Sequence, residues 1–439
     1  GACTSKPVQR AAPPVDAGVD AGPGADGGDG GDGGPGRPDG GPQDGGPADG
    51  GTSDAGLSGA WEPLGPPLGH DAQVYPAMAL DPSGALLVAL ADLVEQPGTT
   101  ATEVRVVRWS GQAWEPVGGT VTRSVERFPF SAPLWVRLTT DTSGRPVLAV
   151  GDSGPGSTSG AFPVHSWVFD GTAWQPVPIP GGAQQLGGLA LGSSSQGRVH
   201  LALSTGRELD LYTLGPGGWA REAAPLAVDG GLSEPDLFAG TDGSTLLAFS
   251  NAPAPGSFGA LRAWRHGAAG WVDLGLPSPA EDGLLFHTPR IRERSDGGVV
   301  VAVSEWRYDA MGKLQTGVAV PVFALGEGGW SRLDADGPPG GFGLSDPIPG
   351  SPVGLQLAGD VPVAVSTGAD GGVLLRAFTA SGSALWAPVI GGVGAGTLLL
   401  LPDGTPVVGA VTQLQQEPGP QSDGGRVQIL HFTGAVTGL

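Results

Sequence analysis

Polar side chains recur at one position of a repeating sequence unit, directly after the second of its short apolar runs. Among them, Glu305 is followed by Trp306 and Arg307. An acid, an aromatic ring and a guanidinium together can hold a sugar or a carboxylate. The structural alternative is that strands end in polar residues where they reach the surface. The candidate ligand-binding face comprises Asp92, Asp152, Ser204, Ser250, Glu305, Trp306, Arg307, Ser366 and Thr412.

Catalysis on this face would need a pair of acids. Glycoside cleavage uses two carboxyl groups set about 5 to 10 Å apart. Only Asp92, Asp152 and Glu305 are acids among the seven strand-end positions. The chain also has no Gly-x-Ser-x-Gly elbow, phosphate loop or dinucleotide fingerprint in a strand–turn–helix context. We therefore assign no catalytic residue and expect no cofactor.

Metal binding is not predicted either. A structural zinc site needs several Cys or His ligands at short, regular spacings. The only cysteine is Cys3, and the six histidines are scattered along the chain, at His70, His165, His200, His266, His287 and His431.

The polar positions belong to a unit that recurs from residue 74 onward. Each unit reads as a short apolar strand, an Asp/Ser/Gly turn, a second strand, a variable loop, a third strand, a tight Gly turn and a Trp that opens a fourth strand. Asp and Gly suit the first turn because a tight hairpin needs positive φ and a side chain that satisfies the backbone. The recurring Trp side chains are interpreted as core residues between neighbouring units. They are Trp114, Trp174, Trp219, Trp271, Trp330 and Trp386.

The seventh unit, residues 396–439, ends after its third strand. A matching fourth strand stands at the other end of the repeat array, where residues 58–65 around Trp61 resemble residues 111–118 around Trp114. Joining the two ends would remove the unpaired edge that an open ring exposes. The sequence therefore predicts an all-β, seven-bladed β-propeller over residues 57–439, closed by its N-terminal strand.

The unit resembles the blades of bacterial Kelch-type and sialidase-type propellers over residues 58–439. Kelch blades end their second strand with a Gly-Gly pair, which is not kept here. Sialidase Asp-boxes need Asp-x-Gly before an aromatic, whereas residues 169–174 read Phe-Asp-Gly-Thr-Ala-Trp. The resemblance implies the fold and transfers neither family's activity.

Topology places the candidate face around the mouth of the central channel, where the loops after the second and fourth strands meet. Arg290, Arg292 and Arg294 alternate along one innermost strand and so share one side of it. They either line the channel or pair with acids of a neighbouring blade. We expect pairing, because charges in such positions are rarely left without a partner.

The N-terminal segment indicates membrane attachment by lipid. Gly1-Ala2-Cys3 resembles the end of a bacterial lipobox, in which the cysteine is acylated, and an unprocessed cytosolic terminus is the alternative. We expect a lipoprotein N-terminus at residues 1–10 and lipidation at Cys3. Residues 11–56, rich in Gly, Asp and Pro, predict a disordered linker. Asp directly after the lipidated cysteine favours retention at the inner membrane. This chain has Thr4 at that position, which points to the outer membrane or cell surface.

Charge narrows the range of partners. The net charge is −21, and the first 57 positions contain nine Asp but only three basic residues. An acidic protein repels phosphate backbones, so nucleic-acid binding is not expected.

Two functions stay open for the propeller. The first is a rigid, monomeric binding module of the cell envelope with a protein or glycan partner. The second is an extracytoplasmic carbohydrate-active hydrolase or lyase with its site at the channel mouth. The absence of a recognisable catalytic constellation favours binding.

Overall fold

The computed structural model describes residues 59–433 with internal gaps, all inside one compact unit, Ser53–Leu439. Every regular element among them is a β-strand, and none is a helix long and apolar enough to cross a membrane. Cys3 and the linker predicted over residues 11–56 lie outside the described residues. The gaps are 73–75, 97–98, 126–134, 152–161, 181–183, 186–187, 206, 229–230, 241, 253–258, 276, 278–283, 308–319, 334–352, 368–372, 380–381, 386–392 and 413–424.

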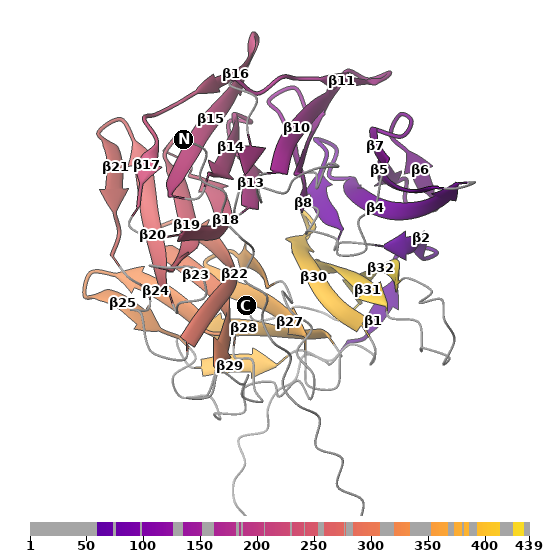
Figure 1. Cartoon of the computed structure of the whole chain (residues 1–439). Coiled ribbons are helices and arrows are strands. Elements are labelled where there is room, and N and C mark those ends of the chain that lie inside the picture. The colour runs from indigo at the N-terminus through magenta and orange to yellow at the C-terminus, as the bar shows by residue number, and fades with distance from the viewer. Residues whose placement is uncertain are drawn as a thin grey trace, which may run out of the picture. The chain divides into compact units, whose positions relative to one another are not determined.

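The strands form seven antiparallel blades of four strands each (Figure 1). Blades 1 to 3 are β3 (Ala77–Leu80), β4 (Leu86–Gln96), β5 (Thr99–Trp109) and β6 (Trp114–Pro116); β8 (Trp135–Thr140), β9 (Pro146–Gly151), β10 (Phe162–Phe169) and β11 (Trp174–Pro176); and β13 (Gly188–Ser193), β14 (Val199–Ser204), β15 (Glu208–Gly215) and β16 (Gly218–Arg221). Blades 4 and 5 are β18 (Gly231–Ala239), β19 (Thr245–Ala252), β20 (Ala260–Gly267) and β21 (Gly270–Asp273); and β22 (Leu284–Glu293), β23 (Val299–Arg307), β24 (Val322–Gly326) and β25 (Gly329–Arg332). Blade 6 is β26 (Gly354–Ala358), β27 (Val361–Thr367), β28 (Val373–Thr379) and β29 (Gly382–Leu385), and blade 7 is β30 (Val393–Leu400), β31 (Pro406–Thr412), β32 (Gly425–Phe432) and β1 (Trp61–Pro63).

Four short strands add to this plan. β2 (Leu68–Ala72) lies between β32 and β4 and so links the last blade to the first. The other three pair with a third strand of a blade: β7 (Thr122–Val125) with β5, β12 (Gln184–Gln185) with β10, and β17 (Leu226–Ala227) with β15.

The innermost strands close a ring. Each one contacts the innermost strand of the next blade, and β30 of the last blade contacts β3 of the first. The core lies between blades, as when Phe286 and Val301 of blade 5 cluster with Leu246 of blade 4. The predicted seven-bladed propeller is confirmed.

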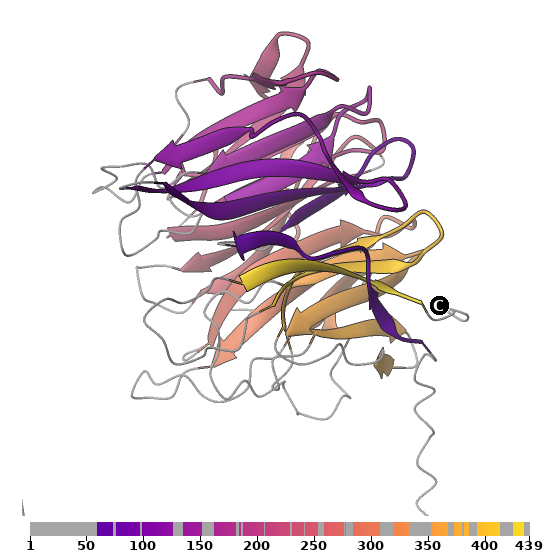
Figure 2. The same cartoon turned by 90° about the vertical axis from the view of Figure 1, so that its right-hand side faces the viewer.

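The closure of the ring is confirmed as well. β1 pairs antiparallel with β32, and Trp61 stands opposite Phe432. Their rings meet edge to face at 5.4 Å, and both side chains are buried. Figure 2 shows the indigo N-terminal strand beside the yellow C-terminal strand.

The recurring Trp side chains join neighbouring blades by hydrogen bonds as well as by packing. The indole Nε1 of Trp174 donates to the carbonyl oxygen of Val117 at 2.8 Å, and that of Trp330 donates to Leu274 at 2.7 Å. Each acceptor lies just after the fourth strand of the preceding blade. The interpretation of these residues as inter-blade core residues is supported; Trp386 lies outside the described residues.

The Asp/Gly turns between first and second strands have the expected geometry. Asp81 and Asp141 each accept hydrogen bonds from the backbone amide two residues ahead, at 2.8 and 2.9 Å. Gly84 and Gly144 take positive φ in the same turns. These short turns hold the innermost strand of each blade against the second strand.

Candidate functional site

The strand-end positions predicted from sequence are mostly buried. Asp92, Ser204, Ser250, Glu305 and Ser366 are at most 6% exposed. Thr412 ends β31, but its side chain is not described, and Asp152 lies outside the described residues. The part of the face that the structure describes is therefore largely covered from solvent.

Asp92 is enclosed by its own blade and by β2. Its Oδ2 forms an ion pair with Nη2 of Arg105 at 2.8 Å. Gly69 of β2 has positive φ, and a Cβ there would collide with the Asp92 carboxylate. The side chain therefore lies against the junction where β2 pairs with the first blade.

Glu305, Trp306 and Arg307 do not form an open platform. The Glu305 carboxylate, 4% exposed, pairs with Nε of Arg307 at 2.8 Å. Trp306 is 5% exposed, donates its indole N–H to Oγ of Ser304 and stacks on His287 with centroids 4.6 Å apart. Asp92 and Glu305 belong to different, non-adjacent blades and are each neutralised by an arginine of their own blade.

A second group of charged side chains, from three blades, meets inside the ring of innermost strands. Arg137 comes from β8, Glu234 and Asp236 from β18, and Arg290 and Arg292 from β22; we call these five residues the channel cluster. Arg137 of blade 2 interacts electrostatically with residues of blades 4 and 5. Because blade 2 is adjacent to neither blade 4 nor blade 5 and meets them only around the central axis, the cluster lies in the channel.

The expected pairing of the β22 arginines is confirmed for Arg292. Its Nη1 lies 3.1 Å from Oδ2 of Asp236 in the neighbouring blade. Arg294 pairs instead with Asp296 in its own turn, at 3.2 Å. Arg290 donates to the carbonyl oxygen of Pro289, and no carboxylate lies within ion-pair distance of it in the described part of the chain.

Two residues at the channel cluster have strained backbone, its member Glu234 and the neighbouring Thr288. Glu234 and Thr288 are the non-glycine residues with positive φ among those described, at 49° and 46°. Each interrupts the strand register of its innermost strand, β18 or β22. The Thr288 amide donates to the Glu234 carboxylate, and Nδ1 of His287 lies 3.8 Å from the same oxygen. Bulges and strained backbone of this kind recur at functional sites, where they redirect side chains.

The electrostatics of the cluster reflect crowding of like and unlike charges. Burial alone would raise the pKa of Glu234, but His287, the Thr288 amide and Arg290 together lower it below its ordinary value. Burial and the nearby charge of Arg290 lower the pKa of Arg137 to about 10. Glu234 and Arg137 therefore stay charged at neutral pH.

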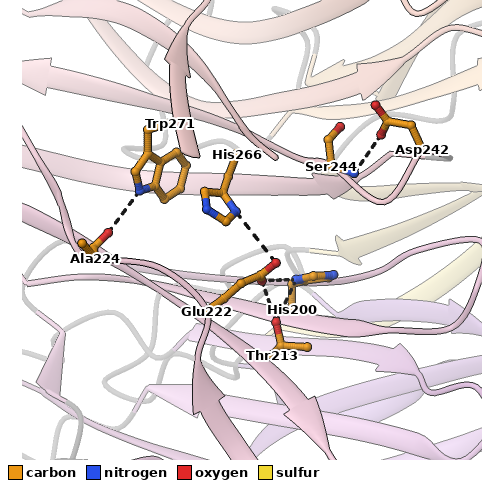
Figure 3. Close-up of polar contacts among 8 residues, drawn as sticks. All are labelled: His200, Thr213, Glu222, Ala224, Asp242, Ser244, His266 and Trp271. Carbon is orange, nitrogen blue, oxygen red and sulfur yellow. Dashed lines mark hydrogen bonds and ion pairs between the residues drawn. The ribbon is translucent and has the colours of Figure 1, made fainter. Parts of the chain in front are cut away.

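A separate polar cluster joins blades 3 and 4 (Figure 3). The Glu222 carboxylate accepts a hydrogen bond from Thr213 at 2.6 Å and lies 2.8 Å from Nδ1 of His200 and 3.8 Å from Nδ1 of His266. Trp271, whose ring packs at a tilt against His266, donates its indole N–H to the carbonyl oxygen of Ala224. Since His200 is 1% exposed, this cluster is a structural link between the blades.

Replacing Glu222 by Gln should weaken acid resistance. Burial alone would raise the pKa of Glu222, but His200 and Thr213 outweigh it and lower the pKa to about 2. Because an unfolded glutamate titrates near 4.3, the stabilisation is complete above about pH 5 and is lost as the pH falls toward 2. We expect a loss of about 1 to 3 kcal/mol at pH 7 and a flatter acid limb in denaturation curves measured from pH 7 to 2. The exposed Glu115→Gln is the control; an equal loss in both variants would contradict this role.

Metal ligation finds no support in the described residues, where no group of three His, Cys, Asp or Glu side chains could hold an ion. The channel cluster is instead suited to bind polar or charged groups of a ligand directly. Its guanidinium and carboxylate groups, with the imidazole of His287 beside Glu234, provide donors and acceptors in one confined space. The channel cluster, rather than the strand-end ring, is therefore the best-supported candidate site.

Comparisons with known proteins agree with the fold. No family model and no curated protein matches the chain. Among solved structures, a polysaccharide lyase described as an ulvan lyase shares 11% identity with a TM-score of 0.54, over 84% of this chain and 94% of that chain. An ulvan lyase bound to -[GlcA(1-4)Rha3S]- shares 10% identity with a TM-score of 0.54, over the same shares of the two chains. An α-L-arabinofuranosidase from Fusarium graminearum shares 12% identity with a TM-score of 0.42, over 68% of this chain and 92% of that chain. At these identities, what the chain has in common with the solved structures is the fold.

Proposed function

We propose that this chain is a lipid-anchored protein of the cell envelope whose propeller is a rigid binding module for a glycan, with its site at the channel cluster. The observation that carries the proposal is the meeting of charges from three blades beside two strained bulges. Backbone strain of this kind costs about 1 to 3 kcal/mol per residue and persists where the surroundings enforce it. Such strain, placed beside a set of converging polar groups, favours a binding role over a purely structural one.

A glycan suits this site better than a protein segment does. Sugar hydroxyls both donate and accept hydrogen bonds, and the Glu234 carboxylate and the guanidinium of Arg290 offer the complementary groups. A folded partner would need a broad surface patch, whereas these groups are confined between innermost strands. A propeller of the same fold has been solved with a bound oligosaccharide, as described above.

The binding test uses the full chain on a glycan array, followed by calorimetry on the glycans retained. Glu234→Gln should weaken binding about tenfold or more, because it removes a charged acceptor from the site. The exposed Glu62→Gln on β1 serves as the matched control and should bind as the parent does. Circular dichroism and melting temperature must show that both variants are folded. Retention of no glycan by the parent chain, or equal affinity in both variants, would refute the proposal.

Carbohydrate cleavage is the second candidate, and one observation favours it. His287 has its Nδ1 facing Glu234, while its buried Nε2 has no hydrogen-bond partner in the described part of the chain. An imidazole oriented by a carboxylate on one nitrogen and free on the other is suited to take up a proton. Incubation of the retained glycans with the parent chain and with His287→Ala separates the two functions. Products that appear only with the parent chain would establish catalysis, and unchanged glycans would leave binding alone.

Membrane attachment through Cys3 is part of the proposal and has its own test. The chain, expressed behind a lipoprotein signal peptide, should be found in the membrane fraction and should incorporate labelled fatty acid. Cys3→Ser should abolish the label and release the chain, because the proposed acyl chains are attached at this cysteine. Stable anchoring requires at least two such chains. Cys3→Ser that stays membrane-bound would show that another element anchors the protein.

A further inference from the structure

Two arginines of the channel cluster have guanidinium groups most of whose N–H donors have no acceptor within the described residues. Nη1 of Arg137 donates to the carbonyl oxygen of Val136 at 3.0 Å, and Nη1 of Arg290 donates to that of Pro289 at 2.8 Å. Neither forms an ion pair within the described residues. A guanidinium carries five N–H donors, so most of the donors of both side chains remain available.

The two carboxylates of the cluster are already engaged elsewhere. Asp236 accepts from the Ile291 amide at 2.9 Å and pairs with Arg292 at 3.1 Å. Glu234 accepts from the Thr288 amide and faces His287. They therefore offset the charge around Arg137 and Arg290 without bonding to either guanidinium.

The formal charge of the channel cluster is opposite in sign to that of the whole protein. Three arginines face two carboxylates in the cluster, whereas the chain carries a net charge of −21. A confined site with low-dielectric walls focuses such a local excess of charge. The channel cluster is thus expected to attract an anion, although the net negative charge of the whole protein repels anions.

Arg137 and Arg290 place like charges on innermost strands of the same ring, each bonded to the carbonyl oxygen of its preceding residue. They come from blades 2 and 5, and the charge of Arg290 disfavours the charged form of Arg137. An anion held between the two guanidinium groups would replace this repulsion by two charge-assisted contacts. A neutral ligand would leave the repulsion in place.

We propose that Arg137 and Arg290 form a subsite for an oxyanion group, the carboxylate or sulfate of an acidic sugar. The assignment rests on the proposed glycan-binding function and narrows its ligands to acidic glycans. Planar guanidinium groups match both oxyanions by paired N–H donors, so carboxylate and sulfate are the shared chemistry here. An acidic peptide is the competing source of the same group.

The first experiment tests the subsite without any glycan. The melting temperature of the full chain is measured in sodium sulfate and in sodium chloride at equal ionic strength, for the parent, Arg137→Gln, Arg290→Gln and the control Arg294→Gln. Sulfate also stabilises proteins generally, so the readout is the difference between variants. The extra stabilisation by sulfate should be lost in Arg137→Gln and Arg290→Gln and kept in Arg294→Gln. The same sulfate effect in all four proteins would overturn the subsite.

The second experiment identifies the source of the oxyanion. The full chain is applied to an array that carries uronate, sulfated and neutral oligosaccharides together with oligoglutamate peptides. Uronate or sulfated glycans should be retained, and Arg137→Gln should weaken their binding about tenfold or more. Retention of neutral glycans alone would overturn this inference while leaving the proposed glycan binding intact. Retention of the peptides alone would refute glycan binding, while a positive sulfate result would still uphold the oxyanion subsite.

Discussion

Deletion of residues 57–66 is expected to destabilise the propeller by more than 3 kcal/mol and to open its ring. This segment contributes the whole fourth strand of blade 7. Its backbone is tied to β32 and beyond by hydrogen bonds, from the Leu64 amide to Ile429 at 2.7 Å and from the Thr433 amide to Ala60 at 2.9 Å. Trp61, 7% exposed, would be lost from a core cluster shared by blades 6 and 7. Truncation of a buried Trp alone typically costs about 3 to 5 kcal/mol.

Denaturant unfolding followed by tryptophan fluorescence measures this effect. The single substitution Trp61→Ala should reproduce most of the loss, while Glu62→Ala, exposed on the same strand, should change stability by less than about 0.5 kcal/mol. Deletion of residues 11–56 should leave the unfolding midpoint unchanged. A deletion of 57–66 that unfolds at the parent midpoint would show that the closing strand contributes little.

Replacing Asp236 by Ala is expected to cost about 3 to 5 kcal/mol, because it leaves a largely buried arginine without its carboxylate. Asp236 joins blades 4 and 5 through Arg292, whose side chain is 16% exposed, and through the Ile291 amide. Asp236→Asn keeps a hydrogen-bond acceptor while losing the charge, so its cost should be smaller, about 1 to 3 kcal/mol. Both values are obtained from urea unfolding of the full chain.

Asp273→Ala is the matched control for this second prediction. Asp273 is 42% exposed, and its ion pair with Arg262 is long at 3.9 Å. Exposed pairs of this kind contribute about 0 to 1 kcal/mol. If Asp236→Ala and Asp273→Ala lower the free energy of unfolding equally, the buried ion pair between blades 4 and 5 stabilises the fold no more than an exposed pair does.

The fold could be predicted from the sequence because its signals are local and repeated. The Asp/Gly turns, the apolar runs and the Trp of each fourth strand recur at similar intervals, and Trp61 could be matched to Trp114 by its neighbours alone. A propeller blade pairs strands that follow one another in the chain, so each blade is specified by its own segment. Only the closing strand required a match between distant parts of the sequence.

The channel cluster could be predicted only in part, because its members meet across the ring. Arg137 and Arg290 are about 150 positions apart, and no spacing rule links them. The register shifts in β18 and β22 also change which side chains face the channel, by inserting residues that have no opposite partner. One signal was present: Glu234 and Thr288 each precede a proline, and each of these prolines precedes a charged member of the cluster.

The strand-end positions illustrate the opposite difficulty. Their recurrence was visible in the sequence, but burial was not. The Glu305 carboxylate is buried in an ion pair with Arg307 of its own strand. The ring of Trp306 is buried against the imidazole of His287. A polar residue at a strand end reads the same in sequence whether it faces a ligand or closes a blade edge.

The indole hydrogen bonds between blades give the ring a direction. Trp174, Trp271 and Trp330 each donate to a carbonyl of the preceding blade, so blade 4 carries both a donor for blade 3 and an acceptor for blade 5. Duplication of a repeat like blade 4 adds a donor and an acceptor together, so the added indole N–H has a carbonyl to bond to. A ring built in this way can gain or lose blades during evolution in complete units, provided that the strand that closes it is kept.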